Sequence, residues 1–278
     1  MSGRGKNPAL AVIKAAFLFL LLFVSLAPVL WVFISSFKSY TEVNSSALSL
    51  PSSLRIKNYI DAFKYAPIAK FFLNSIIIVG ASIAVTSFCV APCAYVVSRF
   101  KFRGRSLIIL LISAALLLPA QAISQPLFFL LNVLSIFDTK QGLILVYSAF
   151  GIPLTFFILV SYYRSIPAAM EEAAYIDGAG FLKTFVYVVL PLAKPGIATA
   201  AILQFINTWN EFYFALMLTS GNTARTIPIA LNYYMGTFAN NYTALFAAVI
   251  ITVLPTIIVF IIAQEQVVES LTAGAIKE

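Results

Sequence analysis

The sequence predicts an all-α protein that crosses a membrane several times, and composition is the first observation behind this prediction. Of the 278 residues, 61% are hydrophobic and only 10% are charged, and the mean hydropathy is +0.96. Soluble domains carry about a quarter charged residues, so this chain cannot present a solvated surface on all sides. We therefore expect a lipid bilayer as its first partner.

The second observation is the number of apolar stretches that are long enough to span a bilayer. A spanning helix needs about 20 mostly apolar residues, and only helices or closed barrels satisfy their backbone groups in lipid. Six stretches qualify. We expect a single transmembrane domain over residues 1–278, with spans at about 12–37, 71–98, 106–131, 142–163, 197–219 and 241–263.

The first stretch also raises the question of a signal peptide, because basic residues precede it. Its uncharged run from Ala15 to Phe37 is too long for a signal-peptide core of about 7–15 residues. We therefore expect a first spanning helix there.

The third observation is the distribution of basic residues, which predicts orientation. Lys and Arg gather in cytoplasmic loops, and the connection "SRFKFRGR" carries the densest basic cluster between two spans. An even number of spans places both termini on one side. We therefore expect both termini, the loop 164–196 and the tail 264–278 in the cytoplasm.

The loop 38–70 would then be external, although it also carries several basic residues. After Pro51 it predicts a short amphipathic helix, with Tyr59, Ile60 and Phe63 on one side and Lys57, Asp61 and Lys64 on the other. Two interpretations are open for this helix. It lies at the membrane interface as a cap on the bundle, or it forms a docking surface for an extracytoplasmic partner.

The residue inventory gives little support for catalysis or for nucleic-acid binding. The chain has no histidine, which removes the commonest metal ligand and general base. Cys89 and Cys93 lie in an apolar run and are expected to be small apolar fillers. The net charge of +8 is not gathered in a soluble basic domain. We expect no enzyme activity, no catalytic or metal-binding residue and no nucleic-acid partner.

The loop 164–196 differs from its surroundings because it is rich in alanine and acidic residues. Pro167 suits the first turn of a helix, and Ser165 before it is a candidate N-cap. Gly178 suits the left-handed turn that ends a helix, and a second short helix would follow over 181–189. The sequence therefore predicts two short helices joined at a glycine corner. A helix that merely lies on the membrane surface is the alternative.

The same loop carries a spacing that is specific to one family. From Glu172 to Pro191 it reads "EAAYIDGAGFLKTFVYVVLP". This resembles the signature E-A-A, three residues, G, nine residues, I-x-L-P of permease subunits of ATP-binding-cassette (ABC) importers, with Val188 as the one departure. The segments "TWNEF" and "ESLTAGAIKE" are similar to the carbohydrate branch, in particular to its smaller maltose-type permease. The resemblance is densest from Arg164 to Glu211.

The resemblance implies the type I permease fold of ABC importers, with six transmembrane helices and cytoplasmic coupling helices between spans four and five. It also implies residues that dock on a separate ATPase, which are Glu171, Glu172, Ala173, Ala174, Asp177, Gly178 and Pro191. Tail contacts with the ATPase would come from Glu269, Thr272, Gly274 and Lys277. The chain has no phosphate-binding loop of the form G-x-x-x-x-G-K-[ST]. No cofactor is therefore expected on this chain, and ATP would be bound by the ATPase.

The resemblance implies a function and further partners. The expected function is ATP-driven import of a sugar or oligosaccharide across the cytoplasmic membrane of a bacterium or archaeon. The expected partners are a second homologous permease, two ATP-binding subunits and an extracytoplasmic sugar-binding protein. Alternatives are an ABC permease for polyamines, phosphate or amino acids, an ion-coupled secondary transporter, and a membrane enzyme.

Polar residues inside two spans are candidates for a translocation pathway or gate. Glu211 is the one acid within a predicted span, and an ionisable group there suggests function. Gln204, Asn207, Thr208 and Glu211 follow helical spacing and would share one face. The candidates are Gln121, Gln125, Gln204, Asn207, Trp209, Asn210 and Glu211. Amide and carboxylate groups suit a polyol, but such residues also join helices to one another without touching a substrate.

Overall fold

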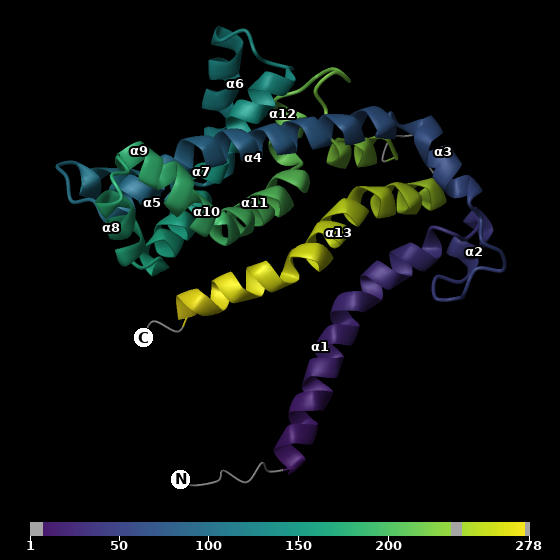
Figure 1. Ribbon diagram of the computed structural model, residues 1–278. Coiled ribbons are helices and arrows are strands. Elements are labelled where there is room, and N and C mark those ends of the chain that lie inside the picture. The colour runs from purple at the N-terminus through teal and green to yellow at the C-terminus, as the bar shows by residue number, and fades with distance from the viewer. Residues whose placement is uncertain (1–7, 235–240, 276–278) are drawn as a thin grey trace. The chain divides into compact units, whose positions relative to one another are not determined.

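The computed structural model describes the backbone of residues 8–234 and 241–275 and the side chains of residues 11–234 and 241–265. Within these ranges every regular element is a helix (Figure 1), which confirms the all-α prediction. The chain divides into two compact units. One is drawn from residues up to Ile68 and from Ala230–Thr252, and the other from Ala69–Ile229 and the residues from Val253 onward.

The first unit contains the N-terminal helix and nearly all of the loop 38–70. Its elements are α1 (Pro8–Ser35), α2 (Tyr40–Ser45), α3 (Lys57–Tyr65), the later part of the 3-10 helix η3 (Ile227–Tyr234) and the first part of α13 (Tyr242–Ala275). The most apolar stretch of α1 has no buried residue, as expected of a helix whose surroundings are lipid.

A buried lysine organises the loop 38–70. Lys38 is fully buried, and its Nζ donates hydrogen bonds to the carbonyl oxygens of Ala47 at 2.8 Å and Ser46 at 3.3 Å. The Asn58 amide donates to the carbonyl oxygens of Ser36 and Lys38, each at 2.8 Å. A buried charge is costly unless it is hydrogen-bonded, so these contacts fix the loop as a folded element.

Helix α3 confirms the short helix expected after Pro51. Its buried residues are Asn58 and Ala62, which are four residues apart and so share a face. Ile60 and Phe63 are 54% and 50% exposed. Tyr59 on the same side packs against Phe37, with ring centroids 5.4 Å apart. The exposed Ile60 and Phe63 leave both interpretations of this helix open.

The second unit holds the remaining helices. They are α4 (Ile68–Arg99), α5 (Arg105–Leu117), the 3-10 helix η1 (Ala120–Ile123), α6 (Ser124–Val133), α7 (Lys140–Ser165), α8 (Ala169–Ile176), α9 (Phe181–Thr184), the π-helix η2 (Phe185–Val189), α10 (Leu190–Leu192), α11 (Lys194–Trp209) and α12 (Tyr213–Met217). A buried cluster joins α4 to α7 and includes Tyr95, Phe156, Leu159 and Tyr163. This cluster forms the base on which α8 and α9 lie.

Four described helices are long and apolar enough to cross a membrane, and two bent pairs raise the number to six if each pair is one span. The span predicted over 106–131 is one of these pairs, since α5 and the η1–α6 helix meet at 99°. Leu118 is extended at this break because Pro119 follows it. The continuous helix expected over 197–219 is also interrupted, because α11 ends at Trp209.

Glycines allow α7 and α11 to approach each other closely. A Cβ at Gly151 would overlap the side-chain amide of Gln204, and a Cβ at Gly196 would overlap the ring of Tyr162. These two helices consequently lie side by side over much of their length. They also frame the segment that joins them, which is the loop 164–196.

Candidate functional site

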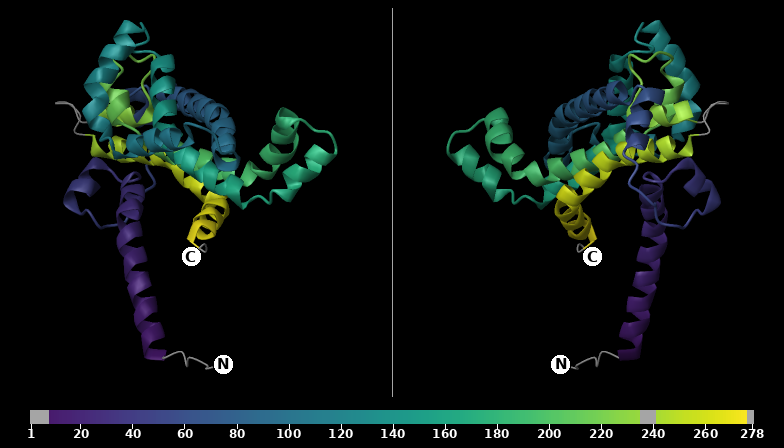
Figure 2. Two further views of the ribbon diagram at one scale, coloured as in Figure 1. Left: turned by 90° about the vertical axis from the view of Figure 1, so that its left-hand side faces the viewer. Right: turned by 90° about the vertical axis from the view of Figure 1, so that its right-hand side faces the viewer.

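The loop 164–196 forms two short helical segments that meet at a glycine corner, as predicted. Helix α8 ends where Gly178 adopts φ +81°, and the Ala179 N–H donates to the Ala174 carbonyl oxygen at 2.9 Å. Glycine occupies this left-handed position with little strain. The chain then returns along α9, η2 and α10 (Figures 1 and 2), and of these α9 and η2 contact α8.

The predicted N-cap of this hairpin is wrong. Helix α7 continues to Ser165, whose hydroxyl donates to the Tyr162 carbonyl oxygen inside that helix. Helix α8 instead begins after Ala168 without a side-chain cap. A serine at this position is compatible with the end of one helix or the start of the next. The apolar span before Ser165 contains no residue that marks where α7 ends.

Glu171 does not lie on the outer surface where an ATPase-docking residue was expected. It is only 7% exposed. Its Oε1 accepts a hydrogen bond from Arg99 Nε at 2.7 Å, and its Oε2 accepts one from the Tyr95 hydroxyl at 2.8 Å. Arg99 also donates to the Ile166 carbonyl oxygen at 2.7 Å. The inner face of α8 is thus tied to the end of α4, and Glu171 serves this attachment.

Aromatic stacking strengthens the same attachment. The Tyr95 ring stacks on Phe181 and Phe185, with ring centroids 5.7 Å and 4.9 Å away. Such aromatic pairs contribute about 0.5–1.5 kcal/mol beyond the area they bury. Both halves of the hairpin therefore contact the same residue of α4, Tyr95.

The other expected docking residues divide between the two faces of the hairpin. Glu172, Ala173, Asp177, Gly178 and Pro191 are exposed, whereas Ala174 is buried. The exposed set forms an outer surface of α8 and the corner, which we call the coupling surface: Glu172, Ala173, Asp177 and Gly178. A small side chain such as Ala173 lets another backbone approach this surface closely.

The residues expected in tail contacts are described less fully. Glu269, Thr272 and Gly274 lie within helix α13, and their side chains are outside the described set. Lys277 lies outside the described residues. Their proposed contact with the ATPase stays a prediction.

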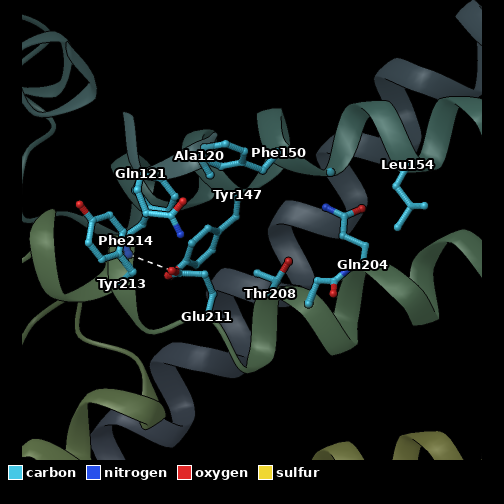
Figure 3. A pocket seen from close by; sticks show the side chains of 12 residues that line it. Ala120, Gln121, Tyr147, Phe150, Leu154, Gln204, Thr208, Glu211, Tyr213 and Phe214 are labelled. Atoms are coloured by element: carbon cyan, nitrogen blue, oxygen red, sulfur yellow. Dashed lines mark hydrogen bonds between the residues drawn. The ribbon is translucent and has the colours of Figure 1, made fainter. Parts of the chain in front are cut away.

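A pocket of about 300 Å³ lies within the second unit. Its walls come chiefly from α7, α11 and the α11–α12 connection, and its lining residues are Ala120, Gln121, Tyr147, Phe150, Gly151, Leu154, Gln204, Asn207, Thr208, Glu211, Tyr213 and Phe214. Figure 3 shows Glu211 beside Tyr147, and Gln204 farther along toward Leu154. The lining combines aromatic rings with amide groups and one carboxylate.

Glu211 lines this pocket, although it is not on the helix that was expected to carry it. It follows the end of α11, and its carboxylate accepts hydrogen bonds from the backbone N–H groups of Phe214 at 2.8 Å and Ala215 at 3.1 Å. The Tyr147 hydroxyl donates to the same carboxylate at 2.7 Å. Glu211 thus orders the start of α12 and joins it to α7. In the structure, Glu211 therefore links α7 to α12 through hydrogen bonds.

Gln204 differs from Glu211 because one of its polar atoms has no partner. Its Nε2 donates to Thr86 Oγ1 at 2.9 Å, whereas its buried Oε1 has no hydrogen-bond partner among the described residues. A buried polar atom without a partner costs about 1–3 kcal/mol. A polar group from outside the described chain, whether a water molecule or a ligand, would satisfy this oxygen.

Three of the candidate pathway residues do not line the pocket. Trp209 is buried, stacks on Phe205 and meets Phe72 edge to face. Asn210 is exposed and its amide donates to the Ile206 carbonyl oxygen of α11. Gln125 is exposed on α6 and does not line the pocket. Of the candidates, Gln121, Gln204, Asn207 and Glu211 are brought together.

Sequence reasoning missed the α7 side of this pocket. Tyr147, Phe150, Gly151 and Leu154 recur at the spacing of one helix face, and this spacing could have identified the set. The span is apolar all round, however, so spacing alone does not show which face meets α11. No group of His, Cys, Asp or Glu that could hold a metal ion occurs in the described part of the chain.

The comparisons with known proteins identify the class of protein. A family model described as "Binding-protein-dependent transport system inner membrane component" matches residues 90–272. The chain belongs to this family and is a multi-pass component of a membrane transport system, not an enzyme. A membrane enzyme and an ion-coupled secondary transporter are thereby set aside.

Individual relatives are similar over nearly their whole length. The chain is 39% identical to the diacetylchitobiose uptake system permease protein of Streptomyces coelicolor, covering 96% of this chain and 89% of the relative. It is 38% identical to the trehalose transport system permease protein of Mycobacterium tuberculosis, covering 91% and 93%. It is 35% identical to the sulfoquinovosyl glycerol transport system permease protein of Agrobacterium fabrum, covering 93% and 91%.

A solved structure shares the fold. The chain resembles a chain in the crystal structure of a bacterial ABC transporter involved in the import of the acidic polysaccharide alginate, with a TM-score of 0.81 and 23% identity. The match covers 95% of this chain and 98% of that one. The permease fold of ABC importers expected from the sequence is therefore confirmed.

Proposed function

We propose that this chain is one of two membrane-spanning subunits of an ATP-driven importer of a sugar or oligosaccharide, and that it couples to a separate ATPase through the loop 164–196. Membership of the transport family supplies the general function. The saccharide is supported by relatives named for diacetylchitobiose, trehalose and trehalose/maltose transport.

The pocket lining favours a saccharide over the other solutes considered. A polyamine needs several acids along its path, and the lining holds only Glu211. Phosphate is recognised by basic side chains, and the lining has no Lys or Arg. Amide and aromatic side chains, in contrast, suit the hydroxyl groups and the apolar ring faces of a sugar.

The observation that carries the coupling role is the division of the acidic residues of α8 between its two faces. Glu171 points inward to Arg99, whereas Glu172 and Asp177 are exposed. An ATPase with a basic or amide-lined cleft would bind the coupling surface. Because the opposite face of α8 is fastened to α4, movement of the docked ATPase would pass directly into a spanning helix.

The proposal includes further partners and an orientation. The partners are a second permease, two ATP-binding subunits and an extracytoplasmic sugar-binding protein, and both termini lie in the cytoplasm of a bacterium or archaeon. The family description names a binding protein. The basic connection 99–105 between α4 and α5 supports the orientation.

Gentle purification from the native membrane tests the assembly. A tagged copy of this chain is expected to retain a second permease and an ATP-binding subunit in a defined complex. A copy with Glu172→Lys is expected to insert and to retain the second permease, but to lose the ATPase. Purification of the wild-type chain alone, with full uptake activity, would contradict the proposed function.

A further inference from the structure

The unpartnered oxygen of Gln204 is the starting point. Gln204 is only 3% exposed, lines the pocket and leaves Oε1 without a hydrogen-bond partner among the described residues. Buried side-chain amides normally satisfy both ends. Because Gln204 lines the pocket, a donor group placed in the pocket is a candidate partner for this oxygen.

The surrounding hydrogen bonds determine which end of the amide is left over. Thr86 Oγ1 donates to the Ser148 carbonyl oxygen at 3.1 Å, so its lone pairs accept the hydrogen bond from Gln204 Nε2 at 2.9 Å. This chain of donors holds Nε2 toward Thr86 and leaves Oε1 as the free acceptor. Gly151 provides the space that the amide occupies, because a Cβ there would overlap it.

The missing ligand group is therefore a hydrogen-bond donor. The pocket also offers the Gln121 and Asn207 amides and the rings of Tyr147, Phe150 and Tyr213. A sugar ring presents hydroxyl donors around its edge and apolar C–H groups on its faces, which matches both features. A volume of about 300 Å³ lies at the lower end of ligand pockets, which suits one sugar unit better than a long oligosaccharide.

The charges of the lining side chains limit the class of ligand further. The only ionisable acid in the lining is Glu211, and no basic side chain lines the pocket. The hydrogen bonds that Glu211 accepts come from neutral groups, namely Tyr147, Phe214 and Ala215. A carboxylate or sulfonate on the ligand would therefore face a like charge with no compensating cation. A lining of this charge disfavours acidic sugar units.

We propose that this pocket is a binding subsite for one neutral sugar unit, and that Gln204 Oε1 accepts the hydrogen of one of its hydroxyl groups. The proposal rests on the saccharide import proposed above and goes beyond it. It assigns direct substrate contact and selection against acidic saccharides to this chain.

The hydrogen bond is tested by removing its two partners separately and together: the sugar hydroxyl by deoxy analogues, and the amide by Gln204→Leu. The complete transporter, with its binding protein, is reconstituted in proteoliposomes, and uptake of the neutral saccharide that it carries is compared with uptake of single-position deoxy analogues. With the wild type, one analogue is expected to lose about tenfold in apparent affinity. With Gln204→Leu, the parent sugar loses the same factor and that analogue loses nothing further, since the two changes remove one interaction.

Matched variants separate contact from structure. Gly151→Ala removes no polar group but displaces the Gln204 amide, so it is expected to lower affinity for the parent sugar in the same direction. Gln141→Leu makes the same chemical change at an exposed position of α7 outside the pocket, and it is expected to behave as the wild type. Alginate oligosaccharides serve as the acidic probe and are expected not to be carried.

Each contrary result has a distinct meaning. Additive losses for every deoxy analogue and Gln204→Leu would show that Gln204 does not contact the sugar, and so would unchanged affinity for the parent sugar in the intact Gln204→Leu complex. Efficient uptake of alginate oligosaccharides would overturn the charge selection. A wild-type complex that carries no saccharide would overturn the proposed function itself, and the subsite with it.

Discussion

At the scale of single residues, two neighbouring glutamates lie on opposite faces of α8. Glu171 is buried against Arg99 and Tyr95, and Glu172 is exposed on the coupling surface. The family resemblance implied that both dock on the ATPase. An acidic pair at the start of a helix does not reveal which member faces inward, so the sequence could not separate them. The side of the helix is decided by packing against α4, which lies far away in the sequence.

Alanine at each of these positions should therefore have different effects. Glu171→Ala leaves the Arg99 guanidinium in a poorly solvated site without its carboxylate, and we expect a loss of about 3 kcal/mol in stability. Glu172→Ala should leave stability unchanged and weaken retention of the ATPase. Thermal unfolding of the purified complex and co-purification of the ATPase measure the two effects. Equal unfolding temperatures for the two variants would contradict this assignment.

Glu42 gives a residue-scale prediction outside the spans. The Ser39 N–H donates to Glu42 Oε2 at 2.6 Å, and Ser52 donates to Oε1 through its hydroxyl and through its N–H at 2.9 Å. These hydrogen bonds, that of Ser39 first, lower the pKa of Glu42 from its ordinary value of 4.5 to about 2. The contribution to stability is therefore complete above pH 4.5 and is lost as pH falls toward 2.

A carboxyl-carbon titration of Glu42 by nuclear magnetic resonance checks this expectation. The midpoint should lie near pH 2 in the wild type. It should move upward in Ser52→Ala, which removes one of the donors but retains the Ser39 N–H. A wild-type midpoint near 4.5 would show that the capping contacts of α2 do not form.

At the scale of elements, the glycine corner offers the sharpest comparison. Gly178 has φ +81°, whereas Gly180 has φ −76°, and no atom lies within 4 Å of a Cβ built at either position. Gly178→Val should therefore strain the corner by about 1–2 kcal/mol and move the coupling surface, while Gly180→Val adopts the native backbone. We expect the first variant to insert but lose its ATPase, and the second to retain it.

Co-purification of each variant with the ATPase is the measurement for this pair. The comparison removes the effect of side-chain bulk, because both variants add the same side chain to exposed positions of one loop. Retention of the ATPase by Gly178→Val, together with normal uptake, would show that the shape of this corner does not determine docking.

The elements also show what the sequence can and cannot predict. Apolar length located every long helix. Gly178 marked a real break, and Pro191 and Pro195 lie on either side of another, at Ala193. The 99° bend beside Pro119 was not predicted, because many membrane helices accommodate proline and the sequence does not show which ones do. The end of α11 at Trp209 was missed for a related reason, since Glu211 continues the helical spacing but caps the next helix instead.

The same limit applies to the pocket. Spacing on α11 correctly placed Gln204 and Asn207 on one surface, since helical periodicity is local. It could not identify Tyr147 or Gly151, because their role depends on which face of α7 meets α11. It also selected Trp209 for its chemistry, although aromatic packing buries that side chain. Contacts between residues far apart in the sequence determine which of these side chains line the pocket.

At the scale of the whole molecule, the coupling surface and the pocket depend on the same helices. The chain runs from the pocket wall in α7 through the hairpin of α8–α10 and returns to the pocket wall in α11. Glu171 and Tyr95 fasten the hairpin to α4, and Thr86 of α4 fastens Gln204. We therefore expect movement imposed on α8 to reach the pocket through packed helices of one compact unit.

Uptake by proteoliposomes that contain the complete complex and its binding protein tests the central claim most directly. With radiolabelled neutral oligosaccharides outside the sealed compartment and ATP on the ATPase side, the account predicts accumulation in step with ATP hydrolysis. It predicts loss of both in Glu172→Lys. Accumulation driven by a proton or sodium gradient without ATP, or undiminished uptake by Glu172→Lys, would contradict it.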